Sequence, residues 1–437
     1  MDNIYKLIFE ATASGEIDKK IAVKILKSLK NEGIKETDDI AIIGMAARLP
    51  MCENLDDFWD IISNGLDCIT PFPENRKKDI DDYIYYSRKH QTDEDTVKYQ
   101  EGAYLKEIDK FDHEFFNLSL KEAELIDPCQ RIFLETVYHA IEDAGYAGKK
   151  LTGSKTGVYV GFASNVKDNY GRIIIDTAPE SVQSSLVGNI SAVMPARISY
   201  LLDLKGPSMV IDTACSSSLA AIHYACQSIK NGDCDMAIAG GVKIHLLPLA
   251  TDNFSLGVES SDYRTRAFDK LADGTGIGDG VGVVLLKPLK KAIKDKDNIY
   301  AVIKGSAINQ DGKSIGITAP TPSAQRDVLV KAWENSGINP ETLSYIEAHG
   351  TATKLGDPIE IEGLERAFRE YTDKKQFCAL SSVKTNIGHL YECAGIIGLI
   401  KAVMALKRKM IPRTINFNIP NSKIDFAQSP IGTITSS

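Results

Sequence analysis

Continuously apolar segments recur along this chain, and they constrain its fold more than any other feature. Several lack the alternation of apolar and polar residues that marks a sheet with one face in water. Sheets of this composition are covered by helices on both faces. We therefore expect an α/β protein with two sheets, parallel or mixed, divided near residue 285. The predicted strands are IAIIGMAA (40–47), GVYVGFAS (157–164), DMAIAGGV (235–242), GVGVVLLKPL (280–289), AVIKGSAI (301–308), LSYIEAHG (343–350) and FCALSSVKTN (377–386).

The first 38 residues differ in texture from the rest of the chain. Ile21, Ile25 and Leu29 recur every four residues, which gives a helix one apolar stripe, and Asp18 has the side chain of a helix N-cap. We expect a short helical segment that is either a linker or an element that contacts a partner.

A second stretch, residues 73–102, is rich in charge and tyrosine and shows no helical period. We expect it to be a surface excursion.

Composition excludes several classes of protein. The net charge of −8 argues against nucleic acid as a partner, because phosphate binding requires concentrated basic surface. The chain has no run of eighteen apolar residues, and charged residues interrupt its N-terminus, so we expect no membrane span, no secretory signal and a cytoplasmic location. The eight cysteines lack CxxC spacing, which predicts free thiols rather than a zinc site or disulfides.

Cys215 lies where a predicted strand turns into a helix. The apolar run 209–211 leads into small residues, and a helix is predicted from about Ser216, with Leu219, Ile222, Cys226 and Ile229 on one face. A thiol at a helix N-terminus faces unpaired N–H groups and the positive end of the dipole, which lower its pKa and can stabilise an oxyanion. We interpret Cys215 as a candidate nucleophile and Cys226 as core. An isolated cysteine is more often structural, so a partner group is required.

Two of the seven histidines have a suitable setting. His349 and His389 each follow a predicted strand and lie beside a glycine turn. Active sites of α/β folds gather at strand ends, so these imidazoles and Cys215 can converge on one pocket, the alternative being three unrelated loop residues. The remaining histidines are interpreted as structural or solvated: His90, His113, His139, His223 and His245.

Three segments carry a resemblance to a known family. They are DTACSSS around Cys215, EAHGTATKLGDPIE around His349 and VKTNIGHL around His389. Together they resemble the signature segments of β-ketoacyl synthases, specifically the ketosynthase domains of modular polyketide synthases, and similar segments extend from residue 40 to about 428. The segment ISYLLDLKGPS and the helical leader are similar to systems in which a separate acyltransferase loads the carrier protein.

The resemblance implies a thiolase-like fold, layered α-β-α-β-α, built from two related halves and normally a homodimer. It divides the chain into an N-terminal helical linker or docking segment (1–38), an N-terminal half that carries the nucleophile (39–285) and a C-terminal half that carries both histidines (286–437).

The resemblance also implies the chemistry. Cys215 would accept an acyl chain from an acyl carrier protein as a thioester. His349 and His389 would drive decarboxylation of a malonyl group on a second carrier protein, and the resulting enolate would extend the chain by two carbons. Lys384 matches the lysine that supports the histidines. Both reactants arrive on phosphopantetheine arms of partner carrier proteins, so no cofactor or metal bound by this chain is expected, and other polyketide synthase domains are expected as partners.

The sequence also departs from the family pattern. Ala352 stands where the family usually has glycine, which is expected to narrow a backbone that approaches the substrate. Asp279 replaces the usual glutamate, and Tyr391, Glu392 and Cys393 replace smaller or differently charged residues; these changes are expected to reshape the pocket wall.

The family's glycine-rich GGTNAH-like stretch, which supplies a second oxyanion donor, has no counterpart before Ser437. Two hypotheses therefore stand side by side. One is an active ketosynthase, and the other is a catalytically impaired fragment that serves as a carrier-protein docking or scaffold element. A third hypothesis, a cysteine hydrolase that uses Cys215 and one histidine, is disfavoured because two histidines on separate strand ends suit decarboxylation better.

Overall fold

The chain divides into two compact units, Met1–Asp39 and Ile40–Ser437, which are described separately. Most of the first unit, with its predicted stripe residues Ile25 and Leu29, lies outside the described residues. A computed structural model describes residues 11–12, 14–15, 17–18, 21–22, 39–87, 98–164, 169–249, 258–314, 316 and 319–433.

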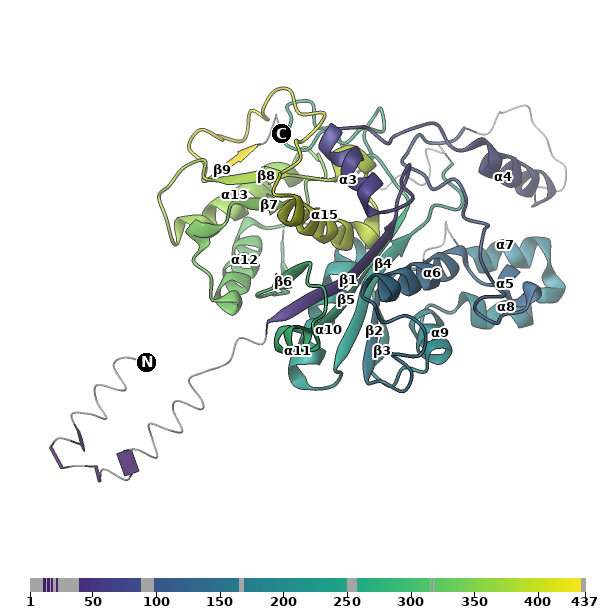
Figure 1. Ribbon diagram of the computed structural model, residues 1–437. Coiled ribbons are helices and arrows are strands. Elements are labelled where there is room, and N and C mark those ends of the chain that lie inside the picture. The colour runs from purple at the N-terminus through teal and green to yellow at the C-terminus, as the bar shows by residue number, and fades with distance from the viewer. Residues whose placement is uncertain are drawn as a thin grey trace. The chain divides into compact units, whose positions relative to one another are not determined.

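A mixed six-stranded sheet forms the centre of the second unit, in the order β3-β2-β4-β5-β1-β6 (Figure 1). β2 runs parallel to β3 and β4, whereas β5 is antiparallel to both β4 and β1. The strands are β1 (Ile40–Arg48), β2 (Thr156–Gly161), β3 (Ser208–Ile211), β4 (Met236–Lys243), β5 (Gly280–Pro288) and β6 (Ala301–Ile303). Residue 285 lies within β5, so this sheet includes strands from both sides of the expected boundary, and the division into halves stays a prediction.

A second, smaller sheet is parallel and has the order β7-β8-β9. Its strands are β7 (Tyr345–Glu347), β8 (Cys378–Ser381) and β9 (Ile431–Thr433). Two sheets are therefore present among the described residues, as the apolar segments predict.

The helices connect and cover these strands. The α-helices are α3 (Leu55–Asn64), α4 (Glu74–Ser87), α5 (Leu120–Glu124), α6 (Pro128–Asp143), α7 (Tyr170–Thr177), α8 (Val182–Asn189), α9 (Val193–Leu202), α10 (Ser217–Asn231), α11 (Leu289–Asp295), α12 (Pro322–Ser336), α13 (Gly356–Arg369), α14 (Lys384–Ile387) and α15 (Ala394–Arg408). Short 3₁₀ turns are η1 (Pro179–Ser181), η2 (Ala214–Ser216), η3 (Pro340–Thr342) and η4 (Tyr391–Cys393).

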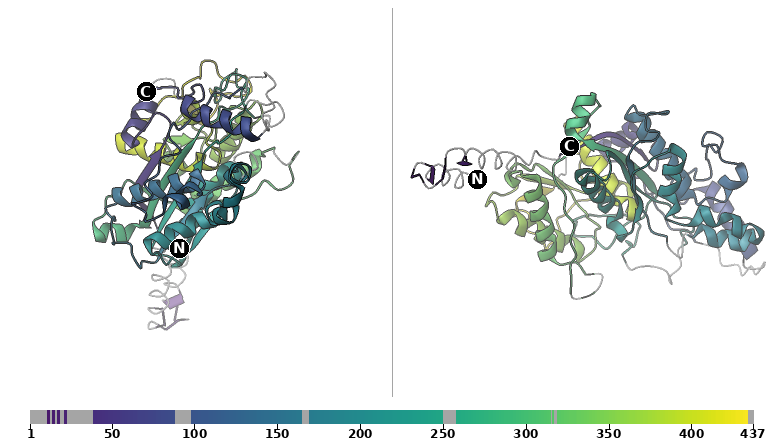
Figure 2. Two further views of the ribbon diagram at one scale, coloured as in Figure 1. Left: turned by 90° about the vertical axis from the view of Figure 1, so that its right-hand side faces the viewer. Right: turned by 90° about the horizontal axis from the view of Figure 1, so that it is seen from below.

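Helices and sheets stack in five layers. α6 and α9 share a core with one face of the six-stranded sheet, and α10 and α15 share another core with its opposite face. α15 also packs against β7, and Figure 2 shows it, in yellow, beside the strands of the large sheet. α12 and α13 supply Trp333, Leu364 and Phe368 to the core of the small sheet. The layer order α-β-α-β-α confirms the thiolase-like fold.

The prediction that residues 73–102 have no helical period is wrong in their first half, which forms α4. The inner face of this helix consists of Arg76 and Ile80, one turn apart and both buried. A helical period is recognised from apolar residues, and a buried arginine is not one of them. The period of this helix is therefore not visible in the sequence. Residues 88–97 lie outside the described residues.

None of the helices described for this chain is long and apolar enough to cross a membrane.

Candidate active site

Cys215 lies in η2, in the turn that connects β3 to α10. Ala214 has φ of 53°, a left-handed conformation that is strained for a residue with a Cβ. Two side chains hold the turn: Asp212 accepts from the Ala214 N–H (3.0 Å), and Ser217 donates to the Ala214 carbonyl (2.6 Å). On the neighbouring strand, a Cβ at Gly161 would lie 2.4 Å from the Ser218 nitrogen, so only glycine there lets the start of α10 approach the sheet.

The predicted acidic shift of the Cys215 thiol is wrong. Burial raises the pKa of Cys215 above its ordinary value, and the carboxylate of Glu392 raises it further. The positive charges of Lys384 and Lys243 lower it, but they do not offset these contributions. The helix terminus is present as predicted, yet desolvation outweighs it. At neutral pH the residue is therefore a thiol rather than a thiolate.

His349 lies in the loop between β7 and α13, and its backbone is held from both sides. Glu360 accepts hydrogen bonds from the N–H groups of His349 (2.7 Å) and Gly350 (2.8 Å). The Lys384 ammonium donates to the His349 carbonyl (2.5 Å). Surrounding protein atoms and then the Lys384 charge lower the pKa of His349, so the imidazole is neutral at pH 7. The residue as a whole is exposed to solvent.

His389 follows α14 and is buried, with 3% of its surface exposed. Its Nδ1 accepts a hydrogen bond from the Tyr391 N–H (3.0 Å), and the Tyr391 ring stacks on it at 4.7 Å between centroids. Burial and the charge of Lys384 lower its pKa well below the ordinary value, so it is neutral and carries its proton on Nε2. Among the residues described, that Nε2 has no hydrogen-bond partner. A buried donor without a partner is available to a substrate oxygen.

The structure brings the sequence-predicted residues together. The rings of His349 and His389 lie 5.6 Å apart and meet edge to face. η2, which carries Cys215, packs against η4 just beyond His389. The charge of Lys384 acts on the thiol and on both imidazoles. The chemical role of each residue stays a prediction.

The sequence analysis did not assign roles to the acidic residues that support Lys384. Burial lowers the pKa of this lysine, whereas the charges of Glu347 and Glu360 oppose that change. Glu347 also accepts from the Val383 N–H (2.6 Å) and pairs with the buried Lys401 (2.8 Å). Two features of the sequence could have indicated these roles. Both glutamates lie in the segment around His349. Lys401 interrupts the apolar run of α15, where burying a lysine without a partner would be costly.

Three of the residues that depart from the family pattern are fully buried. Asp279 is fully buried and pairs with Arg76 (2.7 Å) and with His245 Nδ1 (3.0 Å). Ala352 is also fully buried and lies in the left-handed region (φ 58°), so its methyl group is surrounded by protein atoms. Cys393 has no exposed surface and fills the core.

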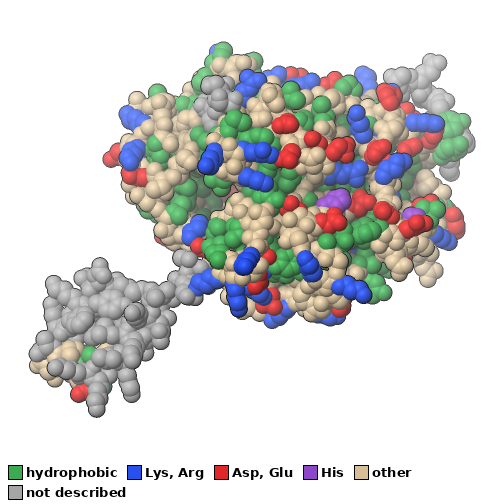
Figure 3. All heavy atoms as spheres, viewed as in Figure 1, with side chains coloured by type: hydrophobic (Ala, Val, Ile, Leu, Met, Phe, Trp, Pro, Cys, Tyr) green, Lys and Arg blue, Asp and Glu red, His purple; other side chains and the backbone are tan. Residues whose placement is uncertain are grey.

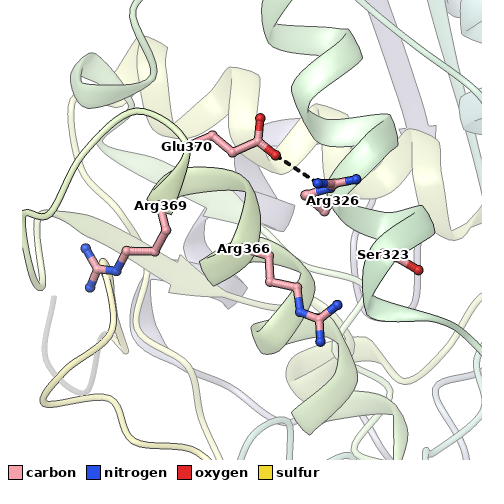
Figure 4. Close-up of a pocket in the computed structure, with 5 residues that line it drawn as sticks. All are labelled: Ser323, Arg326, Arg366, Arg369 and Glu370. Atoms are coloured by element: carbon pink, nitrogen blue, oxygen red, sulfur yellow. Dashed lines mark hydrogen bonds and ion pairs between the residues drawn. The ribbon is translucent and has the colours of Figure 1, made fainter.

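Charged side chains of both signs are interspersed on the face shown in Figure 3. A surface pocket of about 420 Å³ lies between α12 and α13 (Figure 4), and its lining consists of Ser323, Arg326, Arg366, Arg369 and Glu370. Its arginines are already engaged: Arg326 pairs with Glu370 (3.2 Å), Arg366 pairs with Glu362, and Arg369 donates to backbone carbonyls. Within the described ranges, no three His, Cys, Asp or Glu residues are arranged to hold a metal ion.

Comparison with known proteins places this geometry in context. The model of the β-ketoacyl synthase N-terminal domain matches residues 37–292, and that of the C-terminal domain matches residues 300–418. The chain is 44% identical to polyketide synthase PksL and 45% identical to polyketide synthase PksM, both of Bacillus subtilis (strain 168), over 92% and 90% of its own length. It spans only 9% of the length of each of these relatives.

Solved structures of ketosynthases also match this chain. The ketosynthase from module 6 of the bacillaene synthase of Bacillus subtilis 168 matches with a TM-score of 0.79 at 42% identity, over 91% of this chain and 66% of that one. Ketosynthase twelve of the bacillaene polyketide synthase of Bacillus amyloliquefaciens matches with a TM-score of 0.81 at 37% identity, over 92% of this chain and 70% of that one.

Proposed function

Because this chain belongs to the β-ketoacyl synthase family, as a ketosynthase domain of a polyketide synthase, we propose that it condenses an acyl group on Cys215 with malonyl-acyl carrier protein. Ketosynthases of polyketide synthases catalyse decarboxylative condensation. The observation that carries the proposal for these residues is the neutral His389, whose Nε2–H lies unpaired beside His349.

The first step is acyl transfer to Cys215. Its sulfur attacks the thioester of an upstream acyl carrier protein, the bond from the acyl carbon to the phosphopantetheine sulfur breaks, and the cysteine proton ends on the departing thiol. N–H groups at the start of α10 are suited to stabilise the oxyanion that forms in this step. Because the thiol pKa is raised, the resting group is the thiol, and its proton must be removed for the sulfur to attack.

The second step is decarboxylation of the malonyl group. Carbon dioxide leaves, and the electron pair of the broken bond forms an enolate whose charge rests on the thioester oxygen. Neutral His349 and His389 are suited to donate hydrogen bonds to that oxygen. The enolate carbon then attacks the Cys215 thioester, whose sulfur leaves and regains a proton. Lys384 acts as a positioning residue through the His349 carbonyl.

The other hypotheses have less support. A hydrolase requires an imidazole that accepts a proton readily, whereas burial and the charge of Lys384 lower the pKa values of both histidines. No observation on the site or the relatives favours an impaired scaffold, since the candidate nucleophile and both histidines are retained.

We also propose a homodimer. β3 is an edge strand of the large sheet, and exposed apolar side chains lie on it and on the nearby helices α8, α9 and α10. They are Met209 on β3, Leu219 on α10, Leu186 on α8, Ile190 directly after α8, and Tyr200 on α9. A second copy is the proposed partner here, and light scattering of the purified chain measures the state. The remaining proposed partners are acyl carrier proteins loaded by a separate acyltransferase and other polyketide synthase domains, and we propose a cytoplasmic location.

Acylation is tested by intact-protein mass spectrometry after incubation with an acyl-cysteamine thioester. We expect one acyl group per chain, located on Cys215 by peptide mapping. Cys215→Ala abolishes the mass shift, whereas Cys226→Ala, which alters a buried cysteine on the following helix α10, retains it. A mass shift that persists in Cys215→Ala contradicts the proposal.

Decarboxylation is tested separately with malonyl-acyl carrier protein and release of carbon dioxide. We expect His349→Ala to lower this rate by about 10² to 10³, the cost of one oxyanion donor, while acylation of Cys215 is largely retained. His139→Ala, which alters an exposed histidine on α6, is the matched control. Equal loss of both steps in His349→Ala would assign it a structural role instead.

A further inference from the structure

A buried ion pair, Glu347–Lys401, lies beside the segment that carries Lys384. Glu347 ends β7 and its side chain is 10% exposed, whereas Lys401 lies on α15 and is 1% exposed. The Lys401 Nζ lies 2.8 Å from Glu347 Oε2 and also donates a hydrogen bond to Ser381 Oγ on β8 (2.6 Å). The pair therefore fixes α15 against two strands of the small sheet.

Both oxygens of the Glu347 carboxylate are engaged. Oε2 accepts from Lys401 and from the Tyr345 hydroxyl, and Oε1 accepts from the Val383 N–H (2.6 Å). A group that accepts hydrogen bonds at both of its oxygens is suited to be an ionised carboxylate. α15 also approaches this side chain closely, because a Cβ at Gly398 would lie 3.2 Å from the Glu347 Cγ. The position and the charge of Glu347 are therefore fixed by its surroundings.

The hydrogen bond to Val383 connects the pair to the active site. Val383 immediately precedes α14, and Lys384 is the first residue of that helix. The Lys384 ammonium donates to the His349 carbonyl (2.5 Å). A continuous series of hydrogen bonds and one peptide bond therefore leads from Lys401 to the backbone of His349.

Glu347 also acts on Lys384 through its charge. Lys384 is buried, with 5% of its surface exposed, and burial lowers its pKa. Negative charge opposes that change, and Glu347 makes the largest such contribution. Removal of this charge is therefore expected to favour the neutral form of the lysine. The titratable groups that face Lys384 lie on β7, α13, η2 and the loops that carry the histidines: Glu347, Asp357, Glu360, Cys215, His349 and His389.

We propose that Glu347, held by Lys401, is a positioning residue for decarboxylation: it anchors the start of α14 and places a negative charge beside the Lys384 ammonium. The ammonium in turn holds the His349 carbonyl, and its positive charge acts on both imidazoles. A positive charge close to these donors stabilises the enolate oxygen that they bind. This assignment rests on the proposed ketosynthase function.

The test follows the conversion of malonyl-acyl carrier protein to acetyl-acyl carrier protein by mass spectrometry as a function of pH. We expect the rate of the wild-type chain to fall at high pH as Lys384 loses its proton. Lys384→Met carries no charge at any pH, so its rate should be low and should lack this alkaline fall. The comparison assigns the fall to Lys384 before the ion pair is altered.

Glu347→Gln keeps an oxygen for the Val383 N–H but removes the negative charge. We expect the alkaline fall to move to lower pH by about one unit, so that the rate at a fixed pH on this limb drops about ten-fold. A role limited to packing would lower the rate equally at every pH. A fall that stays at the wild-type pH would overturn the proposal and leave the ketosynthase function intact.

Lys401→Met is the matched variant, because it breaks the same ion pair from the other side. Both single variants remove one partner of a buried pair, so both should lower the free energy of unfolding. Lys401→Met, however, removes a positive charge, and the alkaline fall should stay in place or move to higher pH. A shift to lower pH in both variants would assign the effect to lost packing and contradict the proposal. Lys331→Met/Glu334→Gln, which alters a surface pair of α12, is expected to keep the wild-type profile.

A variant that leaves no partner of the pair behind keeps the test independent of folding. Glu347→Gln/Lys401→Met removes both charges, a change that buried ion pairs commonly tolerate. Glu347 makes the largest charge contribution to the pKa of Lys384, so the alkaline fall should again lie at lower pH than in the wild-type chain. Equal positions of the two falls would count against the role of Glu347.

A second measurement separates this inference from the proposed function. If the wild-type chain does not decarboxylate malonyl-acyl carrier protein, the proposed function is wrong for this chain, and alkylation of Cys215 by iodoacetamide decides the role of Glu347. The Lys384 charge lowers the pKa of that thiol, so Glu347→Gln should move the alkylation curve to higher pH through loss of the ammonium. Direct removal of a negative charge would move the curve to lower pH instead. A shift in that direction, or no shift, overturns the inference.

Discussion

Two buried polar clusters in the second unit contrast in how completely their hydrogen bonds are satisfied. In the Asp279 cluster (Arg76, His245 and Asp279), both carboxylate oxygens are used: Oδ1 accepts from the His245 N–H (2.8 Å) and its Nδ1 (3.0 Å), and Oδ2 accepts from Arg76 (2.7 Å). In the site around Cys215, His389 Nε2 and Glu392 Oε2 are left without hydrogen-bond partners within the described structure.

The difference separates a structural cluster from a site that is prepared for a ligand. A fully satisfied cluster gains nothing by admitting another molecule, because every donor and acceptor already has a partner. A site with an unpaired donor and an unpaired acceptor recovers its desolvation cost only when a substrate supplies the missing groups. We therefore expect changes in the Asp279 cluster to alter folding and changes in the site to alter chemistry.

The largest expected effect is on stability. Asp279→Asn leaves the Arg76 charge buried without its partner, and we expect the free energy of unfolding to fall by about 3–5 kcal/mol. Urea denaturation measures this change. Glu362→Gln, in a half-exposed ion pair, is the control and is expected to cost about 0.5 kcal/mol or less. A comparable loss in both variants would contradict the contrast.

The Asp279 carboxylate also predicts how the free energy of unfolding depends on pH. Burial alone raises the pKa of Asp279, but the charge of Arg76 and the hydrogen bond from His245 outweigh it, and the pKa is lowered. Its contribution to stability is therefore present above the pKa of the unfolded chain, about 3.9, and is lost as the pH falls below that value toward the folded pKa. Urea titrations between pH 7 and pH 3 should show this loss in the wild-type chain and a weaker dependence in Asp279→Asn.

The next largest expected effect is on the rate of decarboxylation. His389→Ala removes the unpaired Nε2 donor, and we expect decarboxylation of malonyl-acyl carrier protein to slow by about 10² to 10³. The free energy of unfolding should change less than in Asp279→Asn, because the variant loses one neutral hydrogen bond, from the Tyr391 N–H to Nδ1, and the stacking on Tyr391, but leaves no buried charge without its partner. Carbon dioxide release and urea denaturation of the same preparation measure both. A stability loss as large as that of Asp279→Asn would make His389 part of a structural cluster.

The smallest expected effect is a shift in the pH dependence of Cys215 alkylation. Because burial and Glu392 raise the pKa of Cys215, we expect its alkylation by iodoacetamide to accelerate with pH to beyond pH 9. Glu392→Gln removes a negative charge that disfavours the thiolate, so the curve should move to lower pH. Mass spectrometry of the peptide that contains Cys215 measures each rate, and Glu362→Gln is the control. A curve that moves to higher pH in Glu392→Gln would show that the carboxylate does not act on the thiol.

Much of the fold followed from local pattern, and the exceptions have identifiable causes. The apolar segments predicted the large sheet because a strand buried on both faces cannot alternate with polar residues. α4 was missed because a paired arginine, Arg76, replaces an apolar residue on its inner face. Glu347 and Lys401 were not assigned because their ion pair joins segments whose contact depends on how α15 packs against the small sheet.

The sequence by itself determined which residues are available and where along the chain they occur: Cys215 at a strand-to-helix turn, and His349 and His389 after strands. These placements depend on local backbone preferences, which short segments encode. Only the tertiary structure decided their protonation. The thiol pKa is raised rather than lowered, and His389 is neutral with its proton on the unpaired Nε2, because desolvation and charge interactions depend on groups distant in sequence, such as Lys384 and Glu392.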